Sequence, residues 1–217
     1  MDPMQFDRRG ILGGLLGLGA AAALGLGFGL TGAGSAQAAA SAEDAQGFVA
    51  GMVDEVTQLV QSGKPIEAQA EDFSTLFARY AAVPQVTRFV MGRTWRDMSP
   101  AQQGKAQDAL VAYVGRVYTS LLNDYQGQTL EVTGAQDFGA KGVLVKTRGK
   151  GEGVQDTEVE WLVSDRGGDG LKLVDVVAEG VSLLQSQRQE FAAMIERRGG
   201  DVDRFLDDLA AGRIAEE

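Results

Sequence analysis

Asp175 is the residue of this sequence that is best placed to do chemistry, because it interrupts the apolar run Leu-Val-Asp-Val-Val at residues 173–177. A carboxylate among aliphatic side chains can act as a general base. It can equally hold a structure together, by pairing with an arginine or by capping backbone amides. We favour the structural role over the catalytic one.

Histidine and cysteine are both absent from the 217 residues. This excludes histidine-based triads, thiolate nucleophiles, disulfides, and metal sites with imidazole or thiolate ligands. Residues 149–153 look like a phosphate-binding loop but lack the following helix and the Ser or Thr after the lysine. Residues 165–170 look like a calcium loop but lack its acidic spacing and its closing Glu. We therefore predict no catalytic residues, no metal site and no cofactor.

The formal net charge of −10 bears on the partners of the protein. We predict no nucleic-acid binding, because contacts to phosphates need clustered Lys and Arg. An anionic membrane surface would also repel the chain. Hydrophobic residues at 44% and charged residues at 23% are ordinary proportions for a globular protein.

Residues 1–38 have the organisation of an export signal. Arg8 and Arg9 precede an uncharged run over residues 11–30, and the segment ends in the small residues of Ala36-Gln37-Ala38. Paired arginines before a Gly- and Ala-rich run are typical of the twin-arginine route. We predict cleavage after Ala38 and a single domain over residues 39–217. The alternative is an uncleaved anchor, because about 20 apolar residues can span a bilayer.

Six helices are expected from apolar spacing near 3.6 residues and from their capping signals. The fourth helix is the clearest, because Ser99 and Pro100 precede Gln102 at a capping-box spacing. The expected helices start at residue 41 and end before Gly63, and then cover residues 67–80, 84–92, 100–124, 184–197 and 201–211.

Between the fourth and fifth helices the apolar period changes from 3.6 to 2, which indicates strands. Four strands are expected, around residues 130–132, 143–147, 159–163 and 171–178, with glycine-rich turns between them. No helix separates the strands, so they must pair antiparallel. The prediction is an α+β fold: N-terminal helices packed on a four-stranded antiparallel sheet, two C-terminal helices, and an apolar cavity between helices and sheet.

Several sequence blocks in residues 73–209 resemble those of the MlaC family, also called the toluene-tolerance family. Met-Gly-Arg-Thr-Trp-Arg at residues 91–96 and Ser-Pro-Ala-Gln-Gln at residues 99–103 are similar to two of them. The most specific block is Val-Asp-Val-Val-Ala-Glu-Gly-Val-Ser-Leu at residues 174–183. Tyr118, Tyr125, Arg188 and Phe191 also stand at the family's spacing, whereas Ala82, Gln103 and Val174 depart from its usual residues.

Members of this family are periplasmic phospholipid-binding partners of an ABC transporter. The resemblance therefore implies a periplasmic carrier, exported by the cleaved N-terminal signal, that is not an enzyme and holds phospholipid as cargo. Its partners would be an inner-membrane ABC transporter with its lipid-binding subunit and an outer-membrane lipoprotein complex. Asp175 and Glu179 would then be structural.

Such a carrier needs an apolar pocket for acyl chains, which we place between the long fourth helix and the sheet. Helix and strand phase give ten candidate lipid-binding residues: Val90, Trp95, Val114, Val117, Tyr118, Leu121, Val145, Trp161, Val176 and Val181. Three alternatives stay open at this point. The first is a hopanoid-associated carrier of the same family, the second is a lipid- or sterol-modifying enzyme with Asp175 as base, and the third is an adaptor with a filled core and no ligand.

Overall fold

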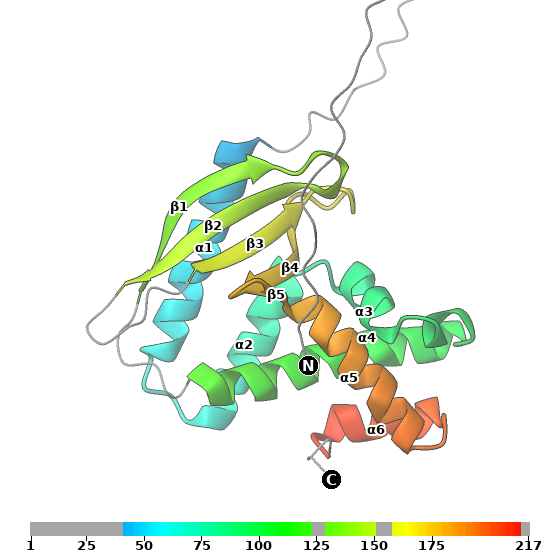
Figure 1. The fold of residues 1–217 in the computed structure, drawn as a ribbon. Helices are drawn as coiled ribbons and strands as arrows, with labels where there is room; N and C mark the ends of the chain where they lie inside the picture. Colours follow the sequence, from blue (N-terminus) through cyan, green and yellow to red (C-terminus); the bar gives the residue numbers. More distant parts are fainter. Residues whose placement is uncertain (1–40, 123–128, 151–157, 214–217) are drawn as a thin grey trace, which may run out of the picture. The chain divides into compact units, whose positions relative to one another are not determined.

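The computed structural model describes residues 41–122, 129–150 and 158–213, so the predicted signal at residues 1–38 lies outside the described residues. The helices are α1 (Ala42–Val60), α2 (Ile66–Tyr80), α3 (Val83–Met91), α4 (Pro100–Leu122), α5 (Leu183–Arg197) and α6 (Val202–Ala211). The short 3-10 helices η1 (Thr94–Arg96) and η2 (Gly139–Lys141) lie between longer elements. The strands are β1 (Thr129–Asp137), β2 (Val143–Lys150), β3 (Glu158–Ser164), β4 (Lys172–Ala178) and β5 (Val181–Ser182). The predicted α+β class is confirmed (Figure 1).

Several helices begin with a side-chain cap at the residue that the sequence predicts. Ser41 Oγ accepts a hydrogen bond from the backbone N–H of Asp44 at 3.0 Å. The predicted capping box before α4 is present: the Gln102 N–H donates to Ser99 Oγ at 3.3 Å, and the Ser99 N–H donates to Gln102 Oε1 at 2.9 Å. These bonds satisfy N–H groups that have no partner within the helix.

The sheet is an antiparallel meander in the order β1-β2-β3-β4-β5, with one strand more than expected. In the additional strand, Val181 pairs with Ala178 and Ser182 pairs with Val177. The connecting turn consists of Glu179 and Gly180, at φ 51° and φ 78°. A two-residue turn with positive φ at both positions suits a tight hairpin. Two paired residues are too few to show an alternating pattern, which is why the sequence did not reveal β5.

Two groups of buried apolar side chains stabilise the fold. The sheet core joins α1 to β2 and β3, and it contains Ala45, Val49, Met52, Val53, Val143, Val145 and Val163. The helix core joins α3, α4, α5 and α6, and its largest fully buried members are Phe191, Phe205, Leu110, Leu206 and Leu209. Figure 1 shows α1 along the sheet near β1 and β2, whereas α5 and α6 lie at the opposite end of the described fold.

The helices that connect the two cores pack very closely at Gly115 of α4. A Cβ at this position would lie 2.6 Å from the carbonyl oxygen of Ala70 in α2, and closer still to Ser74 Oγ. The hydroxyl of Ser74 donates to the carbonyls of Ala70 at 2.9 Å and of Val111 at 3.3 Å. α2 and α4 are thus in near backbone contact. No α-helix in the described part of the chain is long and apolar enough to cross a membrane.

Candidate functional site

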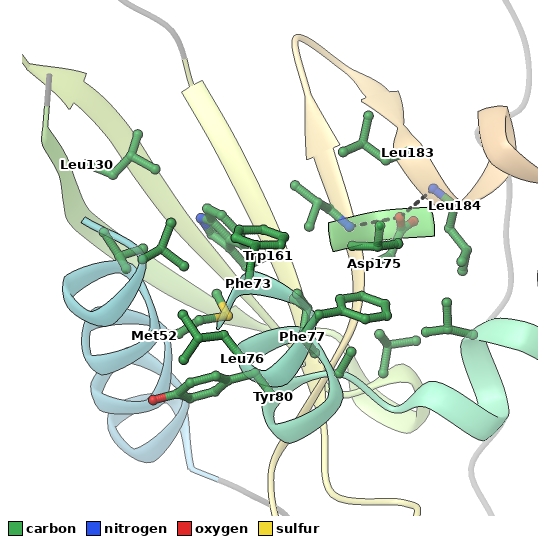
Figure 2. Close-up of a pocket in the computed structure, with 18 of the residues that line it drawn as sticks. Met52, Phe73, Leu76, Phe77, Tyr80, Leu130, Trp161, Asp175, Leu183 and Leu184 are labelled. Carbon is green, nitrogen blue, oxygen red and sulfur yellow. Dashed lines mark hydrogen bonds between the residues drawn. The ribbon is translucent and has the colours of Figure 1, made fainter. Parts of the chain in front are cut away.

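A cavity of about 470 Å³ lies between the sheet core and the helix core. Members of both cores reach it, since Met52 and Val53 come from the first and Val86, Val90 and Leu110 from the second. This volume is within the usual range of small-molecule sites. Figure 2 shows the labelled side chains of α1, α2, β1, β3 and β4 arranged around the cavity.

Helix α2 supplies the most aromatic wall of the cavity. Phe73, Leu76, Phe77 and Tyr80 recur at helical spacing on its apolar side, and all four line the cavity. None of the residues of α2 is fully buried, although its apolar stripe is pronounced. A packed helix normally buries such a stripe against a neighbour. Here the stripe faces an open volume, as Figure 2 shows, so this part of the fold is a pocket wall.

The sheet supplies the facing wall. Trp161 of β3 pairs with Val176 of β4, and both line the cavity. The indole N–H of Trp161 donates to Thr147 Oγ1 at 2.9 Å, so its polar atom is satisfied within the sheet. A bulge in β4 pairs Leu162 with Asp175 but Val163 with Leu173. Leu173 and Val176 therefore share one face of the sheet, although they are three residues apart.

Asp175 fixes the start of α5 at the edge of the pocket. Its Oδ1 accepts from the backbone N–H groups of Val176 at 2.8 Å and Leu184 at 3.1 Å. Its Oδ2 accepts from the hydroxyl of Ser182 at 2.6 Å, and Ser182 is the N-cap of α5. Figure 2 shows the carboxylate directed at the backbone N–H of Leu184. Of the two structural roles considered for Asp175, the structure contains the backbone cap.

Replacing Asp175 by alanine should lower the free energy of unfolding by roughly 2–4 kcal/mol. The two backbone N–H groups and the Ser182 hydroxyl, all partly buried, would lose their charged acceptor. Thermal melting measures the loss. Asp169→Ala in the exposed loop before β4 is the matched control and should change stability by less than about 0.5 kcal/mol. If Asp175→Ala melts like the unchanged protein, the cap does not hold α5.

The lining of the cavity is almost without charge. Asp175 is the only charged residue among the lining residues that the structure describes. The polar tip of Tyr80 is also engaged, because its hydroxyl donates to Glu55 Oε1 at 2.8 Å. Within the described ranges, no group of three or more acidic, His or Cys residues could hold a metal ion. The site is therefore suited to an apolar ligand that is held by contact area.

Four of the ten sequence-predicted residues line the cavity: Val90, Val114, Trp161 and Val176. Their role in binding lipid stays a prediction. Trp95 and Val117 pack instead against the helix core. The side chains of Tyr118 and Leu121 lie outside the described residues.

Val145 and Val181 do not line the cavity, and each has a physical reason. Val145 is on the same sheet face as Trp161, its cross-strand neighbour, but it is 0% exposed within the sheet core, where α1 covers this face. Val181 is 56% exposed, beside the tight turn between β4 and β5. The expected place of the pocket also needs correction, because α1 and α2 form most of its helical side and α4 adds only Leu110 and Val114.

Nine of the lining residues that sequence reasoning missed belong to these two helices: Met52, Val53, Val56, Thr57 and Val60 of α1, and Phe73, Leu76, Phe77 and Tyr80 of α2. One signal was available for α2. Its apolar stripe is aromatic, and the residues that follow it in the sequence include Ala81 and Val86, which line the same cavity. For α1 the stripe looks the same whether it covers a sheet or a pocket.

Comparisons with known proteins agree with this geometry. A family model described as "MlaC protein" matches residues 50–211. The toluene tolerance protein ttg2D of Pseudomonas putida is 27% identical over 122 residues, which are 55% of this chain and 55% of that protein. The match thus spans about half the length of that relative.

A solved structure gives a longer match. It is that of a phospholipid-binding protein from Ralstonia solanacearum in complex with a phospholipid. The TM-score is 0.64 and the identity is 25%, and the match covers 79% of this chain and 99% of the other. The family model, the relative and the solved structure all agree with the resemblance found in the sequence blocks. Because the family model covers most of its length, this chain belongs to the MlaC family.

Proposed function

We propose that this protein is a phospholipid carrier whose pocket encloses acyl chains. The observation that carries the proposal is the apolar cavity of about 470 Å³. Among its described lining residues only Asp175 is charged, and its carboxylate already caps α5. The similar Ralstonia solanacearum structure holds a phospholipid. The pocket lining offers contact area in place of reactive groups, which supports binding and transport in preference to catalysis.

The energetics of lipid transfer explain why such a pocket is needed. A diacyl phospholipid has on the order of 30 methylene groups, and exposing each of them to water costs about 0.8 kcal/mol. The total, roughly 20 kcal/mol or more, makes free diffusion through water negligible. A carrier lowers this cost by surrounding the chains with side chains such as those of Phe73, Phe77 and Trp161.

We further propose that the carrier works in the periplasm, between an outer-membrane lipoprotein complex and an inner-membrane ABC transporter with its lipid-binding subunit. Membership of the MlaC family supports this route. The signal-like pattern of residues 1–38 supports export, by the twin-arginine route in this proposal, with cleavage after Ala38.

Organic extraction of protein recovered from the periplasmic fraction, followed by lipid mass spectrometry, tests the function. We expect about one or two phospholipids per protein, and an intact protein mass that begins at Ala39. Recovered hopanoid would keep the carrier but change its cargo. A chemically altered lipid after incubation would indicate an enzyme. A protein without any extractable lipid would favour the adaptor and would contradict the carrier.

A further inference from the structure

Positive charge is unevenly distributed along this acidic chain. The sequence contains 30 Asp and Glu residues, yet residues 73–96 contain none of them. The same stretch contains four arginines. Three of them follow closely on one another: Arg88 lies on α3, Arg93 lies between Gly92 and η1, and Arg96 is the last residue of η1. A local excess of positive charge in a chain of net charge −10 marks this part of the surface as different from the rest.

Arg188 of α5 adds a fourth guanidinium group to this place. Its Cζ lies 4.9 Å from the centre of the ring of Phe89, the residue that follows Arg88 in the sequence. A Cβ on Gly92, directly before Arg93, would lie 3.2 Å from Arg188 Nε. Arg188 therefore packs against the end of α3 at Phe89 and Gly92, and α3 and α5 are in contact.

These four arginines, which we call the arginine surface, have no anionic partner among the described residues. Other cations of the chain do pair, as Lys64 does with Asp72 and Arg198 with Asp208. Arg88, Arg93 and Arg96 are exposed, and Arg188 is half-buried. The loop between β3 and β4 approaches the start of α3, since a Cβ on its Gly167 would lie 2.8 Å from Gln85 Nε2.

We propose that the arginine surface is a docking site for an acidic surface of a partner protein. Charge complementarity carries the choice of partner, and all four cations are arginines, whose planar fork binds carboxylates with two hydrogen bonds. A bare anionic membrane fits less well. The net charge of −10 opposes approach to it, and the apolar side of α3, with Val86 and Val90, is buried and cannot insert.

The position of α3 connects this surface to the pocket. Val86 and Val90 line the cavity from the inner side of the helix that carries Arg88 on its outer side. A partner bound to the arginine surface would thus sit one helix diameter from the cargo, about 10 Å. The docking site itself does not depend on which ligand the pocket holds.

The test uses a fluorescein-labelled decaglutamate peptide and measures its anisotropy with the purified protein at an ionic strength of about 0.1 M. The unchanged protein should bind the peptide, and binding should weaken at least tenfold in the double variant Arg88→Glu, Arg93→Glu. The matched control is Arg197→Glu, Arg204→Glu, which changes two other exposed arginines and gives the same net charge. The control should bind within about threefold of the unchanged protein, because screening limits charge effects to about 10 Å.

Three results would overturn the proposal. The first is a failure of the unchanged protein to bind the peptide, and the second is an equal loss of binding in the two double variants. The third is tighter binding to phosphatidylglycerol vesicles than to the peptide, with the same dependence on Arg88 and Arg93, which would assign the surface to a membrane. Thermal melting confirms that each variant is folded. If the glutamate pair fails to fold, Arg88→Gln, Arg93→Gln replaces it, with an expected loss of at least threefold.

Discussion

Replacing Gly115 by alanine is expected to destabilise the protein by about 2–3 kcal/mol, because the new methyl group has no room between α4 and α2. A Cβ there would lie 2.6 Å from the Ala70 carbonyl oxygen, which belongs to the backbone and cannot rotate away. Ordinary contacts of carbon atoms begin near 3.5 Å, so α2 must move. The displacement also weakens the hydrogen bond from the Ser74 hydroxyl to the Val111 carbonyl.

The expected sign is informative because helix propensity predicts the opposite. Alanine is more favourable than glycine in a helix interior by about 1 kcal/mol. Gly104→Ala in the same helix is the matched control, since nothing lies within 4 Å of its Cβ position. Gly104→Ala should raise the melting temperature slightly, and Gly115→Ala should lower it by roughly 5–10 °C. Similar melting of the two variants would show that α2 and α4 are not in backbone contact.

Close contact at Gly115 also matters for the pocket. α2 carries Phe73, Leu76 and Phe77, and α4 carries Leu110 and Val114, all of them lining residues. A shift of α2 away from α4 changes the distance between these two walls. We therefore expect the Gly115→Ala protein that remains folded to retain less lipid than the Gly104→Ala protein.

Most of the elements follow from local patterns in the sequence. The capping box at Ser99 and Gln102 predicts the start of α4, and the structure contains both of its hydrogen bonds. Alternation of Val159, Trp161 and Val163 predicts β3 and its inner face, and these residues pair with Thr147, Val145 and Val143. Such features depend on a few neighbouring residues, so one sequence is sufficient to show them.

The pocket could be predicted only in part, because periodicity identifies a face but not what covers it. Val145 and Val176 are both valines on the inner face of the sheet, each opposite Trp161. α1 covers the first, which lies in the sheet core, whereas the second faces the cavity. That difference depends on where α1 crosses the sheet, which is a long-range contact. For the same reason, the apolar stripes of α1 and α2 do not by themselves show that these helices line a pocket.

Val176→Glu should abolish lipid loading while leaving a folded protein. Val176 lines the cavity opposite Trp161, so a glutamate there would place a carboxylate among the acyl chains. In the loaded state this charge has neither water nor a partner, which costs several kcal/mol. Each 1.4 kcal/mol is a factor of ten in affinity, so we expect at least a hundredfold weaker retention. In the empty state water can fill the cavity and solvate the carboxylate.

Two other valines from the predicted site provide matched controls for the same substitution. Val145→Glu buries the charge in the sheet core, at a position that is 0% exposed, and should destabilise by about 4 kcal/mol or more and prevent soluble expression. Val181→Glu, at a position that is 56% exposed, should change neither melting nor lipid content. Soluble yield is measured for all three variants, and thermal melting and extractable lipid are measured on each soluble sample. A folded and fully loaded Val176→Glu protein would mean that Val176 does not contact the cargo. An unfolded one would mean that the position is core, and the binding wall would then have to be sought on α2, at Phe73 and Phe77.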